Sequence, residues 1–410
     1  MQRYLSALGA VALCGMTPPV FSDVITDRNE NAVALATPRM VPPAAQRAVA
    51  MVQVAMFDAV NSIERRYRPY LVQLQAAPAT SEEAAAAAAA GTVLVGLFRP
   101  SREQVQGMMA SYLAAFPDGE AKSEGIKLGE AVAARILEAR ATDGADAPDA
   151  YRAKTRPGVY VPTPITVGST WPNVKPFALV SPSQFRPGPP IALTGEQWAA
   201  DYNEIKDLGS RNSTKRSPRQ TEDARFWLIT GPQSTDPILR QLVAAKKLSL
   251  IDSARFMALA SVALADAYIA VMDAKYRYEF WRPITAIRNA DLDDNPATQA
   301  DPTWQPIDNT PMHPEYPCAH CIGSSALAAV VEALFGTTEV PEISMTSSTA
   351  PGVTHRWTNL RAYTDEVSQA RIWAGFHYRF STLVGQDMGR KIGGYVVQNA
   401  MQPATVADAR

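Results

Sequence analysis

The sequence predicts an all-α protein, a helical bundle with an additional helical region at its N-terminus. Apolar residues recur at the three- and four-residue spacing of amphipathic helices in most of the chain. No sequence segment of useful length alternates apolar and polar residues as a half-buried strand does, and there is no internal repeat. Hydrophobic residues make up 47% of the 410 residues, which is enough for a sizeable core.

Residues 1–22 have the pattern of a secretory signal peptide. Arg3 supplies the positive start, Leu5 to Met16 form an apolar run, and Ser22 ends a small-residue cleavage pattern. Cys14 would suit lipid attachment, but the leucine before it is bulkier than the residue such sites normally show. We therefore expect export to an oxidising space, so that the protein is secreted or periplasmic.

The first part of the mature chain, residues 23–155, is a helical scaffold. Apolar spacing predicts helices at 44–62, 81–98, 101–116 and 122–141. The second part, residues 156–236, begins with a strap that is rich in proline and aromatic residues up to Pro190, and this strap could cover a pocket. Connecting helices are predicted after it, at 194–208 and 221–229.

The third part, residues 237–400, is the predicted helical core, and residues 401–410 form a tail. Helices are predicted at 237–248, from Asp252 as N-cap to about Phe280, at 321–335 and at 365–380. The longest apolar stretch of the mature chain that we identify, Ala84 to Phe98, is shorter than the ~20 residues of a membrane helix. We expect a soluble mature protein with no membrane span.

The net charge is −1, with acidic and basic residues interspersed along the chain. This balance gives no electrostatic case for nucleic acid or for an anionic membrane surface as a partner. Basic residues that matter for function must therefore act locally. The sequence leaves open whether the protein forms a homo-oligomer.

Three short segments in the last third contain the residues that hold a tetrahedral oxyanion. They are Lys275 with Arg282-Pro283, then Pro317-Cys318-Ala319-His320, then Arg371 with His377. Together they supply one Lys, two Arg and two His, the fixed cations, forked donors and imidazoles that such an anion needs. Each segment alone is a weak signal, whereas the ordered trio is a strong one.

Each segment also has an ordinary structural interpretation. Lys275 and Arg282 are seven residues apart, so they share a helix face if the helix runs on to residue 281, but they could equally be surface cations at a helix end. His320 would lie at a helix N-terminus, either beside an anion or simply in a capped helix. In a helix over 365–380, Arg371 and His377 would lie about 120° apart, so that the arginine must curl round to share a ligand.

The trio resembles the signature Lys-x6-Arg-Pro, Pro-Ser-Gly-His, Ser-Arg-x5-His of the vanadium-dependent haloperoxidase and type 2 phosphatidic acid phosphatase superfamily. The chain looks like a bacterial, secreted member of the haloperoxidase branch, and residues 54–61 also fit it. The resemblance implies the helical bundle of the haloperoxidase and acid phosphatase type. It also implies a bound vanadate cofactor, with hydrogen peroxide and a halide as reactants, or a phosphomonoester as the alternative substrate.

The same resemblance assigns roles to residues. Lys275, Arg282 and Arg371 would bind the oxyanion's oxygens, His377 would be the vanadium ligand or the phosphate nucleophile, and His320 the general acid–base. Lys275 would also polarise peroxide. Cys318 and Ala319 occupy oxyanion-binding positions. His313 falls at the halide-tuning position, although a plain turn histidine before Pro314 is equally consistent with the sequence.

The chain departs from the family pattern at four positions. Cys318 replaces a serine whose hydroxyl is a stronger donor, and Ala319 replaces a glycine. Ala370 replaces the serine before Arg371. Ser381 stands where a carboxylate is expected to orient the imidazole of His377. These changes predict weakened or altered activity.

The two cysteines Cys318 and Cys321 form a Cys-x-x-Cys motif. In an oxidising compartment they could form a disulfide, which would remove the Cys318 donor from the anion site. A thioredoxin-like role lacks the βαβ pattern that surrounds such motifs. A zinc site using these cysteines with His313 and His320 lacks the usual second ligand cluster, since only His355 and His377 remain.

Three observations favour the peroxidase over a phosphatase. The N-terminal region and strap exceed what a small acid phosphatase needs, a lipid phosphatase would have membrane spans, and Ser381 leaves the histidine nucleophile without a carboxylate. Two alternatives stay open: an acid phosphatase that forms a phosphohistidine, and a weakly active or non-catalytic oxyanion-binding relative.

Overall fold

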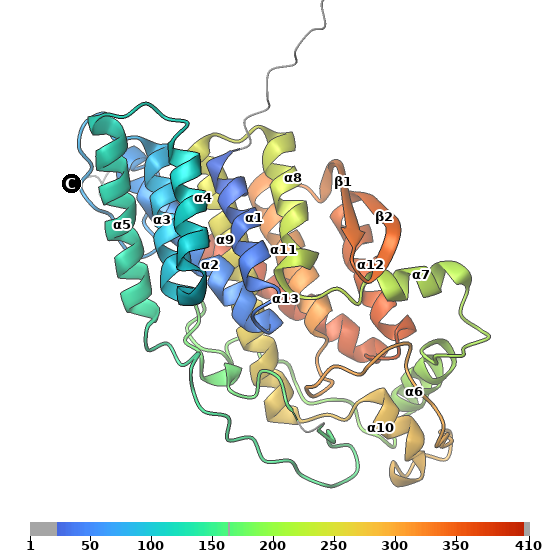
Figure 1. The fold of residues 1–410 in the computed structure, drawn as a ribbon. Helices are drawn as coiled ribbons and strands as arrows, with labels where there is room; N and C mark the ends of the chain where they lie inside the picture. The colour runs from blue at the N-terminus through green and yellow to red at the C-terminus, as the bar shows by residue number, and fades with distance from the viewer. Residues whose placement is uncertain (1–22, 163–164, 406–410) are drawn as a thin grey trace, which may run out of the picture.

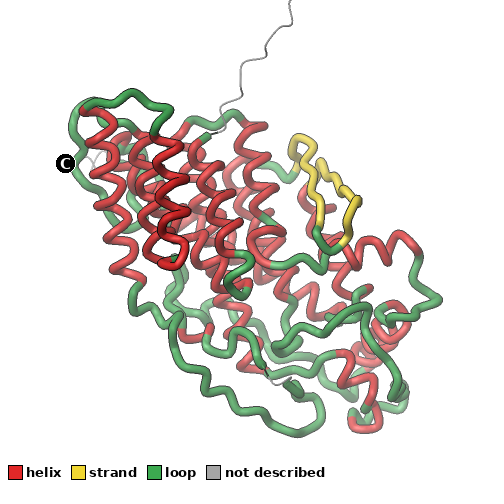
Figure 2. The backbone as a smooth tube through the Cα atoms, in the orientation of Figure 1, coloured by secondary structure: helices red, strands yellow, loops and turns green. Residues whose placement is uncertain are grey.

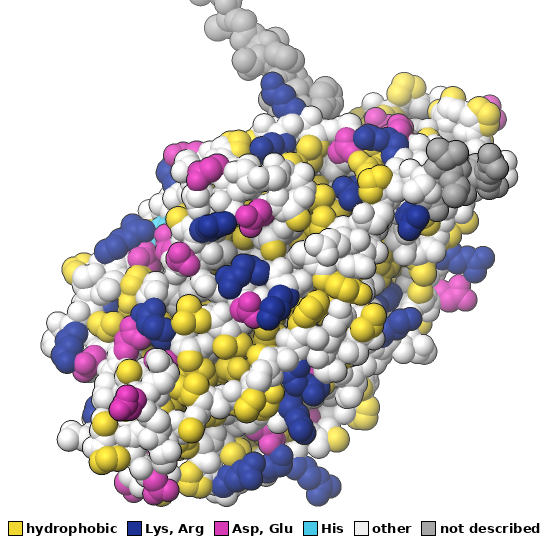
Figure 3. Space-filling model, turned by 180° about the vertical axis from the view of Figure 1, so that it is seen from behind, with side chains coloured by type: hydrophobic (Ala, Val, Ile, Leu, Met, Phe, Trp, Pro, Cys, Tyr) yellow, Lys and Arg dark blue, Asp and Glu magenta, His cyan; other side chains and the backbone are white. Residues whose placement is uncertain are grey.

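The computed structural model describes residues 23–162 and 165–405, so the predicted signal peptide lies outside the described residues. The fold is mostly α-helical, as predicted, with one two-stranded hairpin (Figure 2). In Figure 1 the N-terminal helices form one end of the molecule, and helices α6, α7 and α10 lie at the other. Basic and acidic side chains are interspersed over the face shown in Figure 3, in keeping with the balanced net charge.

The N-terminal end consists of a first helix that the sequence analysis missed, followed by the four it predicted. They are α1 (Val24–Ala36), α2 (Pro42–Glu64), α3 (Glu82–Leu97), α4 (Arg102–Leu113) and α5 (Glu120–Arg140). The alanines of α3 let α5 approach closely, because a Cβ atom on Gly129 would lie 2.2 Å from the Ala85 carbonyl oxygen. This end is joined to the rest through α2, which packs on the central helix α9.

Helices α6 (Glu196–Leu208), α7 (Pro218–Phe226) and α8 (Asp236–Lys246) come close to their predicted bounds. Before them, between α5 and α6, lies the proline-rich strap, which is drawn mostly as loop in Figure 2. Its backbone N–H groups at residues 177–179 donate to the buried carboxylate of Asp266, at 2.6 to 2.9 Å. Arg186 makes a two-pronged ion pair with Asp273. The strap is therefore fastened to the helix that carries both aspartates.

That helix, α9 (Leu250–Tyr278), forms the centre of the core. By length and composition it could cross a membrane, but 94% of its most apolar window is buried inside the protein. Its N-cap is Ser249, not Asp252 as predicted. It ends at Tyr278 because Glu279 adopts a left-handed conformation, φ 49°. The predicted end at about Phe280 is thus close to the observed one. Arg282 lies outside α9 and precedes the short helix α10 (Pro283–Arg288), so the condition for Lys275 and Arg282 to share one helix face is not met.

The C-terminal core contains α11 (Ala319–Phe335), α12 (Leu360–Trp373) and α13 (Arg379–Asn399). Helices α11 and α13 pack closely, since a Cβ atom on Gly389 would lie 2.3 Å from the Ile322 carbonyl oxygen. The predicted helix over 365–380 is wrong in its second half. The chain leaves α12 after Trp373 and turns at Gly375, φ 79°, so His377 lies in a loop between two helices.

A β-hairpin between α11 and α12 was missed by the sequence analysis. Strand β1 (Glu339–Ser347) pairs antiparallel with β2 (Ala350–Asn359). Register shifts interrupt the pairing in two places, and β1 contains Pro341. These irregularities disrupt the simple alternation of apolar and polar residues that would have revealed the strands.

Candidate active site

Residues of the second and third predicted segments line one cavity of about 390 Å³. His313, Ala319, His320, Arg371 and His377 contribute to its wall. Apolar side chains from distant parts of the chain complete it, among them Pro42 and Pro43 at the start of α2, Val167 of the strap, and Leu228, Met272, Met312 and Phe376. Lys275 and Arg282 do not line this cavity. Arg282 contacts the carbonyl of His313, which does, and Lys275 contacts the carbonyls of the next two residues.

His377 is oriented by a buried carboxylate that the sequence analysis did not identify. Its Nδ1 atom lies 2.7 Å from Oε1 of Glu315, and the backbone N–H of Tyr378 donates to the same oxygen. Because a carboxylate accepts, Nδ1 carries the proton and Nε2 presents its lone pair. The expectation that Ser381 leaves this histidine without a carboxylate is therefore wrong. Glu315 lies two residues before the second segment, between Pro314 and Tyr316, and its acidity was the available signal.

Glu315 is fully buried, and burial raises its pKa to about 7 against the opposing attraction of Lys275 and Arg282. The Lys275 ammonium donates to the carbonyl oxygens of Pro314 and Glu315, at 2.9 and 2.7 Å. Burial, together with the charge of Arg282, holds the pKa of Lys275 well below its usual value. Lys275 thus fixes the backbone of the residue that orients His377.

Arg282 connects the two histidines His313 and His377. Its Nε donates to the His313 carbonyl at 2.8 Å, and Nη2 lies 2.9 Å from His313 Nδ1. Its Nη1 donates to the Phe376 carbonyl at 3.0 Å and lies 3.3 Å from Nε2 of His377. Burial lowers the pKa of Arg282 to about 10. The helix break before residue 282 is what allows this guanidinium to reach both loops.

Arg371, in the last turn of α12, is buried with an unused donor. Its Nη1 donates to the Trp227 carbonyl, and its guanidinium carbon lies 4.9 Å from the centre of the Phe376 ring. Its Nε has no hydrogen-bond partner among the described residues. Burial and the charge of Arg282 lower the pKa of Arg371 to about 9. A buried, charged donor without an acceptor is the kind of group that a bound anion satisfies.

His320 lies in the first turn of α11 and is half-buried at the cavity. Its Nε2 lies 2.9 Å from the Ile229 carbonyl, and because a carbonyl only accepts, Nε2 carries the proton. Nδ1 of the neutral ring is then an acceptor. Burial and the nearby Arg371 hold the pKa of His320 well below its usual value, so the imidazole is neutral at pH 7.

Cys318 and Cys321 form a disulfide, one of the states that the sequence left open. Cys318 is fully buried and does not line the cavity, and its sulfur accepts from the backbone N–H of Cys321 at 3.2 Å as the N-cap of α11. The structure therefore does not place Cys318 as an oxyanion donor. The disulfide also rules out these sulfurs as zinc ligands. Ala319 does line the cavity.

The site as a whole has an excess of positive charge. Lys275, Arg282 and Arg371 are each no more than 1% exposed, and Glu315 is the carboxylate that acts on two of them. Burial of these three basic groups beside one partly protonated carboxyl group disfavours their charged forms, and a tetrahedral oxyanion would offset that cost. The unpaired Nε of Arg371 adds a donor for the anion's oxygens, and the lone pair on His377 faces its central atom.

Two family models match the chain in sequence order. The vanadium chloroperoxidase N-terminal domain matches residues 20–166, and the second helical-bundle domain of the same family matches residues 255–405. A curated relative, the vanadium chloroperoxidase of Curvularia inaequalis, is 29% identical over 192 residues. The matched part covers 39% of this chain and 31% of that protein, so it spans about a third of the relative's length.

Solved structures share the fold over nearly the whole chain. A bacterial vanadium-dependent iodoperoxidase matches with a TM-score of 0.78 and 24% identity, over 95% of this chain and 99% of that one. The holo form of a bacterial vanadium-dependent chloroperoxidase matches with a TM-score of 0.70 and 17% identity, over 90% and 95%. Since the two family models together cover most of the sequence, the chain belongs to the vanadium haloperoxidase family, a family of enzymes.

Proposed function

We propose that this protein binds vanadate and uses hydrogen peroxide to oxidise a halide, with bromide and iodide as the first candidates. The observation that carries the proposal is the buried cluster of Lys275, Arg282 and Arg371 beside the lone pair of His377. The overall reaction consumes a halide ion, hydrogen peroxide and a proton, and it yields hypohalous acid and water. Bound vanadate would supply the Lewis-acidic centre at which peroxide becomes an oxidant toward halide.

Each residue of the site has a physical task in this proposal. His377 would hold the anion through Nε2, because Glu315 keeps the proton on Nδ1. Lys275, Arg282 and Arg371 would bind the anion's oxygens, with Nε of Arg371 free to donate. His320, whose Nδ1 is unprotonated, would accept a proton from incoming peroxide and return it to the departing oxygen.

His313 is proposed to tune the halide. It is half-buried on the cavity wall, and its Nδ1 faces Nη2 of Arg282 at 2.9 Å. A halide approaching this wall would meet an imidazole ring backed by an arginine, together with the apolar side chains of Met312 and Phe376. Such a weakly hydrated surface suits the larger, softer halides better than chloride.

An acid phosphatase is the second candidate, and the structure removes one argument against it. Glu315 gives His377 the carboxylate that a histidine nucleophile needs. In that reaction Nε2 of His377 would attack phosphorus, the bond to the substrate oxygen would break, and His320 would protonate the leaving alkoxide. Water would then hydrolyse the phosphohistidine.

The two functions are separated by one pair of assays on the purified full chain. Protein reconstituted with orthovanadate should brominate or iodinate an acceptor only when peroxide is present. The rate at which vanadate-free protein hydrolyses a phosphomonoester should be much lower than the rate at which reconstituted protein halogenates the acceptor. Phosphomonoester hydrolysis without any peroxide-dependent halogenation would favour the phosphatase. Absence of both activities would favour a non-catalytic anion-binding relative.

We also propose that the protein works in a secreted or periplasmic setting. Two observations support this: the signal-like residues 1–22 and the disulfide between Cys318 and Cys321, a bond that persists in oxidising compartments. Export of the full chain, with cleavage before Asp23, can be checked by mass spectrometry of the culture medium and periplasm.

A further inference from the structure

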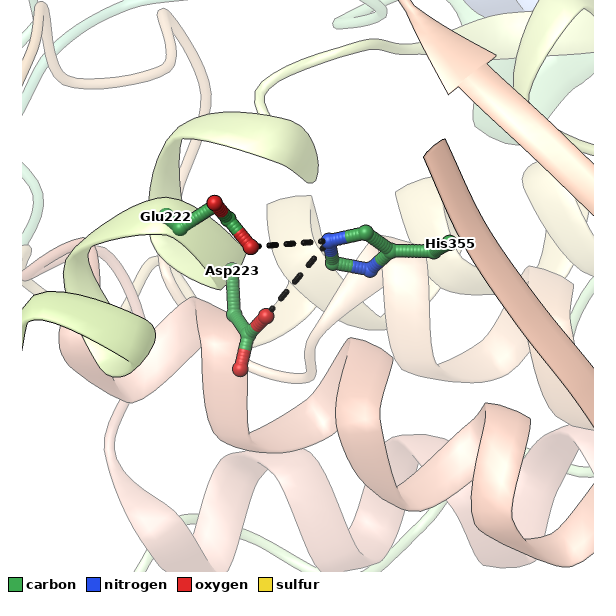
Figure 4. A group of neighbouring side chains, drawn as sticks. All are labelled: Glu222, Asp223 and His355. Carbon is green, nitrogen blue, oxygen red and sulfur yellow. Dashed lines mark ion pairs between the residues drawn. The ribbon is translucent and has the colours of Figure 1, made fainter. Parts of the chain in front are cut away.

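Outside the active site, three side chains with metal-ligand chemistry meet between α7 and the β-hairpin. Glu222 and Asp223 come from α7, and His355 comes from β2 (Figure 4). Nε2 of His355 lies 3.7 Å from Oε1 of Glu222 and 3.6 Å from Oδ1 of Asp223. One ligand atom from each of the three residues lies within 4.8 Å of the others. These separations are too long for hydrogen bonds.

The tautomer of His355 is set by a carboxylate on its other side. Nδ1 lies 2.6 Å from Oε1 of Glu366, so Nδ1 carries a proton, and in the neutral ring Nε2 presents a lone pair. His355 is 2% exposed, and its Nε2 has no hydrogen-bond partner among the described residues. Oδ1 of Asp223 is likewise buried without one. In the neutral ring a buried lone pair thus faces two carboxylates, and a cation between them would satisfy all three groups.

The nearby arginine does not supply that cation to His355. Arg219 has its Nε 2.9 Å from Oδ1 of Asp223, outside hydrogen-bond geometry, and its Nη1 donates to Glu222 at 3.1 Å. Its side chain is 61% exposed, and the ion pairs of so exposed a group contribute little. It screens the carboxylates but leaves Nε2 of His355 without a partner.

We propose that His355, Glu222 and Asp223 bind a divalent first-row transition-metal cation, with Zn²⁺ the best match. A tetrahedral metal with bonds of about 2.0–2.2 Å holds its ligand atoms about 3.3–3.6 Å apart, close to the two distances from Nε2. Imidazole favours such metals over Mg²⁺ or Ca²⁺, which prefer all-oxygen sites. The carboxylate on Nδ1 is the usual outer partner of a metal-bound histidine. Half-exposed Glu222 leaves room for water as a fourth ligand.

The metal would hold together three elements that support the active-site cavity. It joins α7 to β2, and through Glu366 it reaches α12. The ring of Phe226, at the end of α7, stacks on His355 with centroids 3.8 Å apart, and Trp227 Nε1 donates to Glu366. The carbonyl of Trp227 then accepts from Arg371, and that of Ile229 contacts His320. The proposed role is structural, and it does not depend on the proposed peroxidase reaction.

The experiment uses untagged full-length protein that has been treated with a chelator and contains no vanadate. Zn²⁺ binding is measured by calorimetric titration, and Co²⁺ binding by visible absorption. One equivalent should bind and raise Tm, and Co²⁺ should give the absorption of a four-coordinate site. Asp223→Asn and His355→Ala should each weaken binding at least tenfold. Asp387→Asn, which removes an exposed carboxylate on α13, should leave binding unchanged. So should His377→Ala, which removes an active-site imidazole.

Arg219→Ala provides a variant that cannot disrupt the core, because the side chain is exposed. Removing this competing cation should tighten Zn²⁺ binding several-fold. Unchanged or weaker binding in Arg219→Ala would contradict a metal placed between the carboxylates. The proposal is overturned if the wild-type protein binds no stoichiometric Zn²⁺ or Co²⁺, or if binding is the same in Asp223→Asn as in wild type.

Discussion

Nδ1 of His377 lies 2.7 Å from Oε1 of Glu315, and both side chains are buried. This pair sets the tautomer of the histidine, so Nε2 presents a lone pair to an electron-poor centre such as the vanadium or phosphorus atom of an oxyanion. Lys275 holds the backbone of Glu315, and Arg282 lies beside Nε2 of His377. The pair therefore links the cations of the site to its proposed ligand.

Replacing Glu315 with glutamine should weaken vanadate binding by about 10- to 100-fold. The amide keeps the shape of the side chain and can still accept a hydrogen bond, but it lacks the charge that increases the basicity of His377. Equilibrium dialysis with vanadium quantified in each chamber measures the affinity. Glu342→Gln, an exposed glutamate paired with Arg356 on the hairpin, is the matched control. Equal affinities in wild type and Glu315→Gln would show that the pair does not position the ligand.

The raised pKa of Glu315 predicts a pH dependence of stability. The pKa of Glu315 in the folded protein, about 7, lies above its usual value of 4.5. The stability that protonated Glu315 gives the folded state is therefore fully present below pH 4.5 and is lost as pH rises through 7. The stability difference between wild type and Glu315→Gln should therefore fall by about 3 kcal/mol between pH 4.5 and 8 in anion-free protein. Urea unfolding across this range measures it. A difference that is flat or grows with pH would contradict the assignment.

Replacing Arg371 with methionine should separate stability from anion binding. In the absence of an anion, relief of repulsion with Arg282 offsets the lost bond to Trp227, so Tm should stay the same or rise. Vanadate at 100 times its Kd should stabilise the wild type by about 2.7 kcal/mol and the variant by far less. Thermal unfolding with and without vanadate provides both numbers, and Arg390→Met, at an exposed position on α13, is the control. A variant that keeps the full vanadate shift would exclude Arg371 from the site.

The disulfide should contribute stability without affecting the anion site. It closes a loop of four residues, for which the chain-entropy model gives about 2 kcal/mol. Replacing Cys318 and Cys321 together with serine should lower the free energy of unfolding by that amount, while the serine hydroxyl introduced in place of the Cys318 sulfur still caps α11. Vanadate affinity should change less than twofold, because Cys318 does not line the cavity. A large change in affinity would place residue 318 at the anion after all.

Because helical periodicity and the ordered motifs are local signals, the sequence was sufficient to predict the all-α class and five residues that line the cavity, His313, Ala319, His320, Arg371 and His377. It did not show how two of the segments are built. Lys275 and Arg282 are separated by the left-handed Glu279, and Arg371 and His377 by the turn at Gly375. The first helix was predicted to end at about Phe280, close to the break, although a glutamate in a left-handed conformation has no reliable sequence signal. The second break was predicted as continuous helix over 365–380, even though Gly375 is a residue at which helices commonly end.

Glu315 was missed for a different reason. The expected position for a carboxylate was four residues after His377, where Ser381 stands, but the carboxylate comes from a loop 62 residues earlier in the chain. Only the packing of that loop beneath His377 reveals the pairing. The hairpin was not predicted because its strands are irregular. Without the hairpin, the sequence could not show that His355 lies beside Asp223 of α7.

The central claim is that His377 holds vanadate in a peroxidase site, and the most direct measurement is vanadium bound per protein with the activity that accompanies it. After reconstitution and desalting, wild type should retain one vanadium per chain and show peroxide-dependent bromination or iodination. His377→Ala should lose both, while Glu342→Gln keeps both. Stoichiometric vanadium in His377→Ala, or wild-type protein that binds vanadate but cleaves a phosphomonoester and oxidises no halide, would contradict the account.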